Sequence, residues 1–578
     1  MITIIIVLAV LCLLSLWYVN KHKLTLIHNK YIYNKVVQAL LPLYHSFSRF
    51  IYKMPNLLYL PKMFGRVDIP EYQLEINPED LRKLEENIPP AVVNGVFVGH
   101  SELNEEYQIS VPAVFTYQNK KYKVKVSLRG DYENHWTDIK KSWQIEFDKE
   151  NLFFGIETIK LILPYDRGYF SEYLNSYRAK KLGVILTEAQ FVKFKINSQS
   201  YGVYYQFEDW SEGFLEKNRL PANSNFYVTD DDVINLDDNF SAFNSPVFWR
   251  KKLSARRYPY DNFSEMDFLL KLLQQENFSD VAPDIINLDS FYRWNILSIL
   301  AGSQHQGGRG NSRLYFNNTS GKFEFVPWDL GIGEPVNDVV VDNLLTSKIL
   351  SDPQREFERN RLLWNYLAVG NNLQDDLQVY DQIYNQLKPA FYREFKKYHN
   401  NIRFDQEVAR IREEYINIYN TTKELFMTDN SAVVYLYVPK DRLIISGINV
   451  DNFAGLMFKA ITFTSGNFSG ALRIYRDDDH DNLLTASDSL LISRTISKND
   501  TIIDLAPLNQ FLFSHRQYNL ENQQSQLTPQ NYTFFIKLPS TPSSASNPEL
   551  HFANAVTNEE VAIQNTQFIN TENLFVYN

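Results

Sequence analysis

The stretch from His305 to Gly331 holds the residues best placed to do chemistry. Two strand-like runs, Arg313 to Phe316 and Lys322 to Val326, flank a cluster of turn-forming residues, which predicts a hairpin. Asn311 lies just before the first strand and Asp329 just after the second, so the hairpin brings both side chains to one end. An amide oxygen and a carboxylate suit a magnesium ion that carries a nucleotide. The alternative is that both residues only shape turns, in which Asn and Asp are common.

Length and composition narrow the class of protein. A chain of 578 residues is too long for one hydrophobic core, and about two to four domains are expected. The single cysteine, Cys12, excludes an intramolecular disulfide and a cysteine zinc cluster. The whole chain carries a net charge of −10, and without the eight basic residues of segment 21–66 the body carries −10 − 8 = −18, which argues against nucleic acid as a partner.

The amino end predicts a single-pass membrane anchor at residues 1–20. No charge occurs from Ile2 to Val19, a run at the short limit for a spanning helix. A cleaved signal peptide is the competing interpretation, but the run lacks a basic start and the small residues of a cleavage site. Residues 21–66 then carry eight Lys and Arg before the first acid, Asp68. This basic amphipathic segment suits the surface of an anionic membrane.

Two features predict opposite orientations in that membrane. The basic flank places the body in the cytoplasm by the positive-inside rule. A carboxy-terminal β-sandwich with an acidic, calcium-like loop fits an extracytoplasmic body, which is the orientation we favour.

Residues 67–430 read as an α+β domain. Strands are expected at 72–76, 111–117, 122–128, 140–147, 191–196 and 203–207, and helices at 78–84, 170–182, 265–276, 288–300 and across much of 355–426. The early strands and helix are typical of a nucleotide-binding upper lobe, and the later helices of a lower lobe, although many α+β domains share this order.

Residues 431–578 predict a separate all-β sandwich, since short strands alternate there with turn signals. One of its loops places acids at positions one, three, five and twelve of an EF-hand-like calcium loop: Asp477, Asp479, Asp481 and Asp488. Asn482 stands where such loops have glycine, and strands replace the usual helices. The competing interpretation is a plain acidic turn.

Five segments within residues 70–430 carry a family resemblance: LRGDYENHWTDIKKSWQIEF, FGIETIKLILP, YLNSYRAKKLGV, VKFKINSQSYGVYYQFED and GSQHQGGRGNSRLYFNNTSGKFEFVPWDLG. In this order they resemble the CotH family, spore-coat-type proteins with an atypical protein-kinase fold. The resemblance implies ATP and Mg²⁺ as cofactors and assigns roles to seven residues. Arg129, Lys140 and Lys141 lie around the phosphates, Glu208 holds the lysine or the metal, Arg178 is structural or faces phosphate, and Asn311 and Asp329 are the metal ligands.

The sequence departs from the family at the expected catalytic acid. Active members are expected to carry an Asp a few residues before Asn311, but residues 303–306 read Ser-Gln-His-Gln. His305 is therefore the candidate catalytic base, while Gln304 or Gln306 could only orient a nucleophile. The alternative for His305 is a loop residue bonded to backbone. Leu330 and Gly331 also follow Asp329 where a second acid is common.

These features together predict a membrane-anchored, ATP- and metal-dependent protein kinase that acts on a coat or cell-envelope protein. The alternative is a catalytically inactive kinase-like scaffold for surface assembly or adhesion. The basic run Trp249 to Tyr260 is either a contact for an acidic or phosphorylated substrate or a solvated face.

Overall fold

The computed structural model describes residues 51–568, apart from 90–91, 94–95, 98–102, 104–105, 131–132, 138, 188, 223, 230–241, 254–261, 308–310, 332–342, 428–431, 438–442, 464–468, 498–499, 520–523 and 540–547. The predicted anchor at residues 1–20, with Cys12, and the basic segment up to residue 50 lie outside the described residues. Among the helices that are described, none is both long and apolar enough to cross a lipid bilayer.

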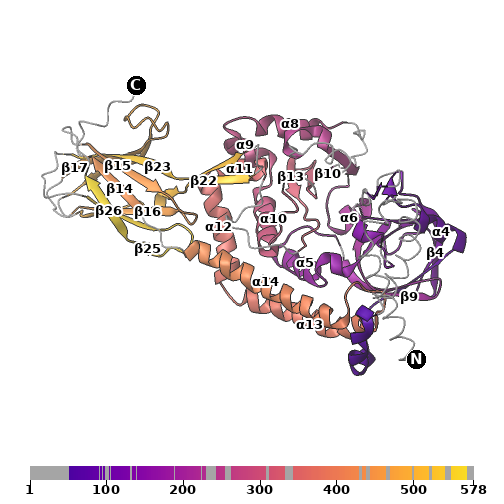
Figure 1. The fold of residues 1–578 in the computed structure, drawn as a ribbon. Helices are drawn as coiled ribbons and strands as arrows, with labels where there is room; N and C mark the ends of the chain where they lie inside the picture. The colour runs from indigo at the N-terminus through magenta and orange to yellow at the C-terminus, as the bar shows by residue number, and fades with distance from the viewer. Residues whose placement is uncertain are drawn as a thin grey trace.

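The elements form three regions arranged in a row (Figure 1). A β-barrel lies at one end, helices and a small sheet fill the middle, and two further sheets form the other end. The long helices α13 (Asn372–Arg393) and α14 (Asn401–Met427) pack side by side along the middle region. The mixed α and β content predicted from the sequence is confirmed.

The barrel closes through seven strands in the order β1-β4-β5-β6-β7-β9-β8. Neighbouring strands are antiparallel except β1 and β8, whose parallel pairing closes the barrel. In β5, Tyr122, Val124 and Val126 point inward while the lysines between them are exposed, the pattern of a half-buried strand. The strands are β1 (Glu71–Ile76), β4 (Val111–Tyr117), β5 (Lys120–Leu128), β6 (Trp143–Phe147), β7 (Thr158–Ile162), β8 (Ala189–Ile196) and β9 (Gln199–Glu208).

Short elements decorate the barrel. Helix α4 (Pro78–Glu86) begins where predicted, because the Asn77 side chain accepts a hydrogen bond from the Glu79 amide and Pro78 fits the first turn. The others are β2 (Val92–Val93), β3 (Val96–Phe97) and the 3₁₀ helices η1 (Met54–Phe64), η2 (Glu133–His135) and η3 (Pro164–Arg167).

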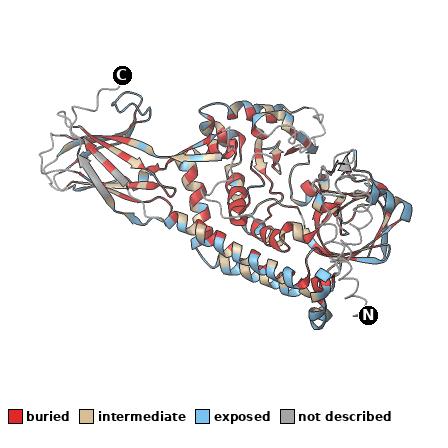
Figure 2. Ribbon diagram, viewed as in Figure 1, coloured by how far each residue is buried: buried red, intermediate tan, exposed pale blue. Residues whose placement is uncertain are grey.

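Helix α10 (Leu288–Ala301) is the centre of the middle region. Ten of its fourteen residues are buried, so it is covered on nearly every side (Figure 2). Asn287 caps its start, and Gly302 ends it in the left-handed conformation. Helices α5 (Ser171–Leu182), α12 (Pro353–Ala368) and α14 pack against α10. The other helices between β9 and α13 in the sequence are α6 (Glu212–Lys217), η4 (Ala242–Asn244), η5 (Pro246–Phe248), α8 (Ser264–Leu273), α9 (Phe278–Ile285) and α11 (Leu344–Leu350).

The hairpin predicted around Gly321 is confirmed. It pairs β12 (Arg313–Asn317) with β13 (Lys322–Phe325), and Gly321 takes the left-handed conformation that the turn needs. With β10 (Asn225–Thr229) and β11 (Trp249–Leu253) it forms a sheet in the order β11-β10-β12-β13. Strand β13 packs against α9 and α10, which fixes the position of the hairpin in the middle region.

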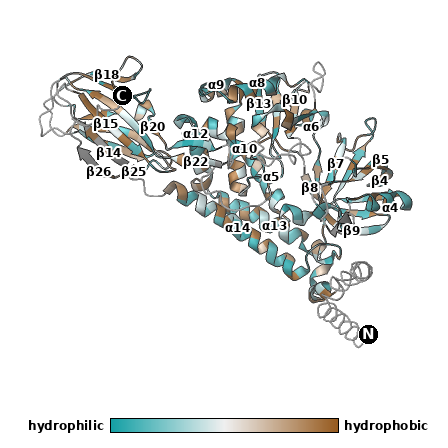
Figure 3. Cartoon of the chain, turned by 45° about the horizontal axis from the view of Figure 1, so that its top comes forward, coloured by the Kyte–Doolittle hydropathy of each residue, from teal (hydrophilic) through white to brown (hydrophobic). Residues whose placement is uncertain are grey.

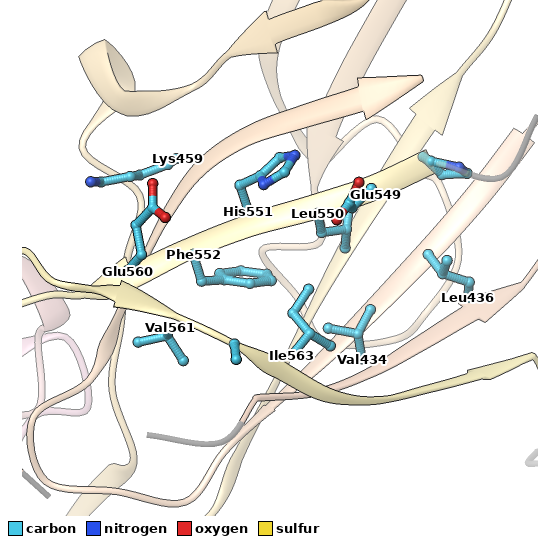
Figure 4. Close-up of a pocket in the computed structure, with 12 residues that line it drawn as sticks. Val434, Leu436, Lys459, Glu549, Leu550, His551, Phe552, Glu560, Val561 and Ile563 are labelled. Atoms are coloured by element: carbon cyan, nitrogen blue, oxygen red, sulfur yellow. The ribbon is translucent and has the colours of Figure 1, made fainter. Parts of the chain in front are cut away.

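Two sheets share one hydrophobic core in the carboxy-terminal region, where hydrophobic residues follow β15 and its neighbours (Figure 3). One has the order β18-β17-β23-β15-β14-β26 and the other β19-β16-β24-β25, with β20 on β16. Beside β24 and β25 lies a cavity of about 360 Å³, lined by Lys459, His551 and Glu560 above apolar side chains (Figure 4). The elements are β14 (Ala432–Tyr437), β15 (Leu443–Val450), β16 (Leu456–Phe463), β17 (Gly470–Arg476), β18 (Ser489–Ile496), β19 (Ile502–Asp504), η6 (Ala506–Leu508), β20 (Phe511–Leu512), β21 (His515–Asn519), β22 (Gln524–Thr528), β23 (Gln530–Lys537), β24 (Pro548–Asn554), β25 (Glu560–Val561) and β26 (Ile563–Phe568).

The hairpin β21–β22 reaches from these sheets to the helices. Arg516 donates to Glu356 of α12 at 3.1 Å, and both side chains are almost fully buried. Phe511 stacks on Phe357, with ring centroids 3.6 Å apart. The carboxy-terminal sheets are thus packed against α12, although the boundary between residues 430 and 431 stays a prediction.

Candidate functional site

The base of the hairpin holds the predicted pair of polar ligands. The Asn311 Nδ2 atom lies 3.3 Å from Asp329 Oδ2, so the structure brings the two side chains into contact. Both residues have positive φ angles, 56° and 55°, which Asn and Asp tolerate better than most residues do. The paired strands therefore place an amide and a carboxylate side by side, with their backbones turned out of the sheet.

Arg167 joins this pair from η3, far away in the sequence. Its guanidinium forms an ion pair with Asp329 and lies over the Trp328 ring, 5.8 Å from the centroid. Asp166 approaches the same arginine, with Oδ2 at 3.6 Å from Nε. The sequence analysis did not single out either residue.

Glu172 of α5 supplies a third carboxylate around Arg167. It is 4% exposed, and its Oε2 atom has no hydrogen-bond partner within the described residues. Burial raises the pKa of Glu172, while Arg167 and the backbone amides of Gly331 and Leu330 oppose that rise. The carboxyl groups of Asp166, Glu172 and Asp329 thus gather around one arginine, Arg167.

The donor set at the hairpin base fits a magnesium ion. Mg²⁺ prefers hard oxygen ligands and uses one or two carboxylates together with substrate phosphates and water. Asp329 and Asn311 would hold such an ion, and the partnerless Oε2 of Glu172 lies in the same neighbourhood. Magnesium binding by Asn311 and Asp329 stays a prediction.

His305 lies at the open side of the site. Its Nδ1 atom is 3.7 Å from Asp329 Oδ1, and its side chain is 59% exposed. Desolvation and the Arg167 charge lower the pKa of His305, and Asp166 opposes this shift. A neutral, accessible imidazole can accept a proton from a substrate hydroxyl.

The side chains next to His305 in the sequence differ in how far they are exposed to a substrate. Gln306 is buried, and its Oε1 atom accepts a hydrogen bond from Trp294 Nε1 at 2.5 Å. Ser303 is also buried, whereas Gln304 is exposed. Gln306 therefore serves the core of the middle region, and His305 and Gln304 are the accessible side chains of this segment.

A cluster of cations lies beside Trp328. Lys160 of β7 forms an ion pair with Asp209 at 2.7 Å, and its Nζ atom is 5.4 Å from the ring centroids of both Trp210 and Trp328. Lys252 reaches the second oxygen of Asp209 at 2.9 Å. Trp328 thus connects Lys160 to the Asp329 group, and Lys160 is the functional candidate that sequence reasoning missed.

Burial determines the charge state of this cluster. Desolvation lowers the pKa of Lys160 to about 7, with Asp209 opposing the shift and Arg129 and Lys252 adding to it. Burial by itself would raise the pKa of Asp209, but the two lysines hold it below its ordinary value. Lys160 and Lys252 therefore share one carboxylate, with the Arg129 charge near Lys160, and an anionic ligand would relieve the repulsion among the three cations.

Comparison with known proteins decides the family. The model of the CotH kinase protein family matches residues 126–435, just over half of the chain. The chain belongs to the CotH kinase protein family. The inner spore coat protein H of Bacillus subtilis (strain 168) is 26% identical over 396 residues, which cover 64% of this chain and 100% of that protein. The proinflammatory kinase CtkA of Helicobacter pylori matches 49% of this chain and 94% of its own at 15% identity, with a TM-score of 0.20. So low a score does not establish a shared arrangement of elements.

Only some of the residues that the resemblance assigned to the nucleotide lie near the candidate site in this CotH family member. Arg129 follows β5 and is near enough to affect Lys160. Lys140 is instead buried against Glu394 at 2.5 Å, and Lys141 donates to the backbone oxygen of Trp136. Glu208 pairs with Lys217 of α6 at 3.2 Å. The structure thus brings Arg129 to the site and engages the other three side chains elsewhere.

The structure also shows what surrounds Arg178 and part of the basic run Trp249 to Tyr260. Arg178 is 1% exposed and donates to Asp376 at 2.8 Å and to the Leu300 carbonyl at 2.7 Å. Of the basic run, Lys252 joins the cation cluster and Lys251 is buried beside Tyr227, while residues 254–260 lie outside the described residues.

Proposed function

We propose that this CotH family member is a kinase-like phosphotransferase that binds ATP with Mg²⁺ and phosphorylates a protein. The observation that carries the proposal is the contact between Asn311 and Asp329, with a cation cluster beside the neighbouring Trp328. Phosphoryl transfer needs a metal site and fixed positive charge for the phosphates, and these two groups supply them. Membership of the family supports the same activity.

Each residue has a role that follows from its position. Asn311 and Asp329 would hold the ion, which would supply positive charge for the phosphates when bound. Arg129 and Lys160 face the phosphates, while the more exposed Lys252 supports Asp209. His305 accepts the proton of the substrate hydroxyl as its oxygen bonds to the terminal phosphorus and the bond to the diphosphate breaks. Arg167 lies beside Asp329 and is able to exchange that carboxylate for a phosphate oxygen.

The substrate and location follow from the anchor prediction. We propose that residues 1–20 hold the protein in a membrane, with the body outside the cytoplasm and a cell-envelope protein as substrate. Protease added to intact cells would then remove the body, whereas a cytoplasmic body would survive until the cells were broken. The acidic loop of the carboxy-terminal sheets supports this orientation, and the basic flank opposes it.

A second candidate function is a catalytically inactive scaffold. Arg167 already neutralises Asp329, and no carboxylate occurs between residues 303 and 306, where active relatives are expected to have one. A scaffold of this kind would retain the fold without binding nucleotide.

Nucleotide binding separates the two candidates. We expect titration calorimetry of the full chain in detergent micelles to show binding of ATP with Mg²⁺. Asp329→Ala should weaken that binding about tenfold or more, because it removes the only carboxylate that contacts Asn311 within the described residues. Asp289→Ala is the control, since Asp289 is an exposed acid on α10 paired with Arg293. A folded wild-type chain that binds no ATP would exclude the kinase and favour the scaffold.

A further inference from the structure

The loop between β17 and β18 gathers acidic side chains at one point. Asp477, Asp479 and Asp481 each offer a carboxylate oxygen, and these oxygens all lie within 4.8 Å of one another. Ligand oxygens lie about 2.3–2.6 Å from a bound calcium ion, so oxygens that share one ion are separated by at most about twice that distance. The spacing in this loop falls within that limit.

Asn482 takes over the role of the glycine that EF-hand-like loops have at the sixth position. Its φ of 59° is left-handed, which Asn adopts more readily than most residues do. Its amide donates to Asp477 Oδ2 at 3.0 Å, and its side-chain oxygen accepts from the Thr533 hydroxyl at 2.8 Å. The chain therefore reverses at the required position despite the sequence departure, and β23 holds it there.

Two buried carboxylate oxygens in this loop lack partners. Asp477 is 2% exposed and Asp488 is 9% exposed, and the Oδ1 atom of each has no hydrogen-bond partner among the described residues. Such atoms are costly to bury, and four neighbouring carboxylates also repel one another. A cation would satisfy the partnerless oxygens and remove the repulsion.

We propose that this loop binds one calcium ion through the carboxylates of Asp477, Asp479 and Asp481, whose oxygens meet this spacing, with the partnerless Oδ1 of Asp488 as the fourth ligand. Calcium fits better than magnesium because four carboxylates on a short irregular loop suit its high and flexible coordination number, whereas magnesium retains much of its water. The proposal is independent of the phosphotransferase activity.

The site lies at the junction between the carboxy-terminal sheets and the helices. A cavity of about 340 Å³ is lined by Asp477 and Asp478 of the loop and by Asp352 and Gln354 at the start of α12. Calcium therefore neutralises a loop that faces the first turn of α12. Bound calcium stabilises the edge hairpin β17–β18 and, through it, the contact with α12.

The test measures calcium binding and thermal stability of the full chain in detergent micelles. Calcium chloride in large excess over its Kd should raise the melting temperature of the wild-type protein by about 5 °C and give a saturable calorimetric signal. Magnesium chloride at the same concentration should give a smaller shift. Chelation by EGTA should reverse the calcium effect.

Three variants connect the signal to the proposed ligands. Asp481→Asn changes an exposed side chain, and Asp477→Asn changes a buried one; both should lose the calcium shift. Asp478→Asn is the matched control in the same loop, because Asp478 pairs with Arg476 at 2.6 Å and accepts from the Ser489 amide at 3.0 Å. This control should keep the calcium shift. The proposal is overturned if the wild-type protein shows no shift, if Asp478→Asn loses it as fully as Asp481→Asn, or if magnesium binds as tightly as calcium.

Discussion

Asp376→Ala should lower the free energy of unfolding by about 3–5 kcal/mol, because it leaves the charge of Arg178 buried without its partner. The two side chains are each 1% exposed, and Arg178 Nε donates to Asp376 Oδ2 at 2.8 Å. Asp376 also accepts a hydrogen bond from the Tyr366 hydroxyl at 3.0 Å, which the substitution removes as well. Arg178 retains only its bonds to Asn175 and to the Leu300 carbonyl among those that are described.

The effect should extend to the candidate site, since Arg178 connects α5 to α10 and α13. Helix α5 also carries Glu172, which lies against the backbone of Leu330 and Gly331. Chemical unfolding measures the stability loss. Asp381→Ala, on α13 like Asp376, is the control. Its pair with Arg412 is partly exposed, so this substitution should lower the free energy of unfolding by less than about 1 kcal/mol. Equal losses in the two variants would show that the buried pair contributes no more than a surface pair.

Local patterns in the sequence were sufficient to predict many individual elements. Asn77, Pro78 and Gly183 mark helix ends through caps that depend only on neighbouring residues. The hairpin of β12 and β13 follows from its turn formers and alternating strands. Barrel closure is different, because the parallel pairing of β1 with β8 joins segments that no local signal relates.

Lys140 and Lys160 show that local sequence patterns also fail to predict which lysine lies at the site. Lys140 stands in an alternating strand pattern, and nothing near it in the sequence indicates a partner for its charge. Its partner, Glu394, comes from the end of α13. Lys160 is one polar residue in an apolar strand and gave no signal. Its position between Trp210 and Trp328 depends on contacts between β7, β9 and the hairpin that only the folded chain makes.

The missing catalytic acid was sought in the sequence only next to Asn311. The structure instead brings Asp166 and Glu172 toward the same place from η3 and α5. Acids supplied by a different segment have no fixed spacing from the motif, so a search by spacing does not find them. Arg167 was missed for the same reason.

Lys160→Met should weaken the binding of ATP with Mg²⁺ about 100-fold, the largest loss of affinity that we expect at the cation cluster. Lys160 is nearly buried, and it is the lysine that lies between Asp209 and the Trp328 ring. A charge in such a desolvated position interacts with a phosphate more strongly than one at the surface does. The methionine side chain fills much of the same space between the aromatic rings, so the change chiefly removes charge.

Lys252→Met is the control that separates phosphate binding from support of Asp209. Both lysines contact that carboxylate, at 2.7 and 2.9 Å, but Lys252 is 38% exposed. If Lys160 holds phosphate, calorimetry should show a much smaller loss of affinity for Lys252→Met, while both variants keep the wild-type circular dichroism spectrum. Similar losses in the two variants would mean that each acts by freeing Asp209. Wild-type affinity in Lys160→Met would place the phosphates elsewhere. Lys141 would then be the next candidate, since the family resemblance places it near the phosphates, although it donates to the Trp136 carbonyl in the structure.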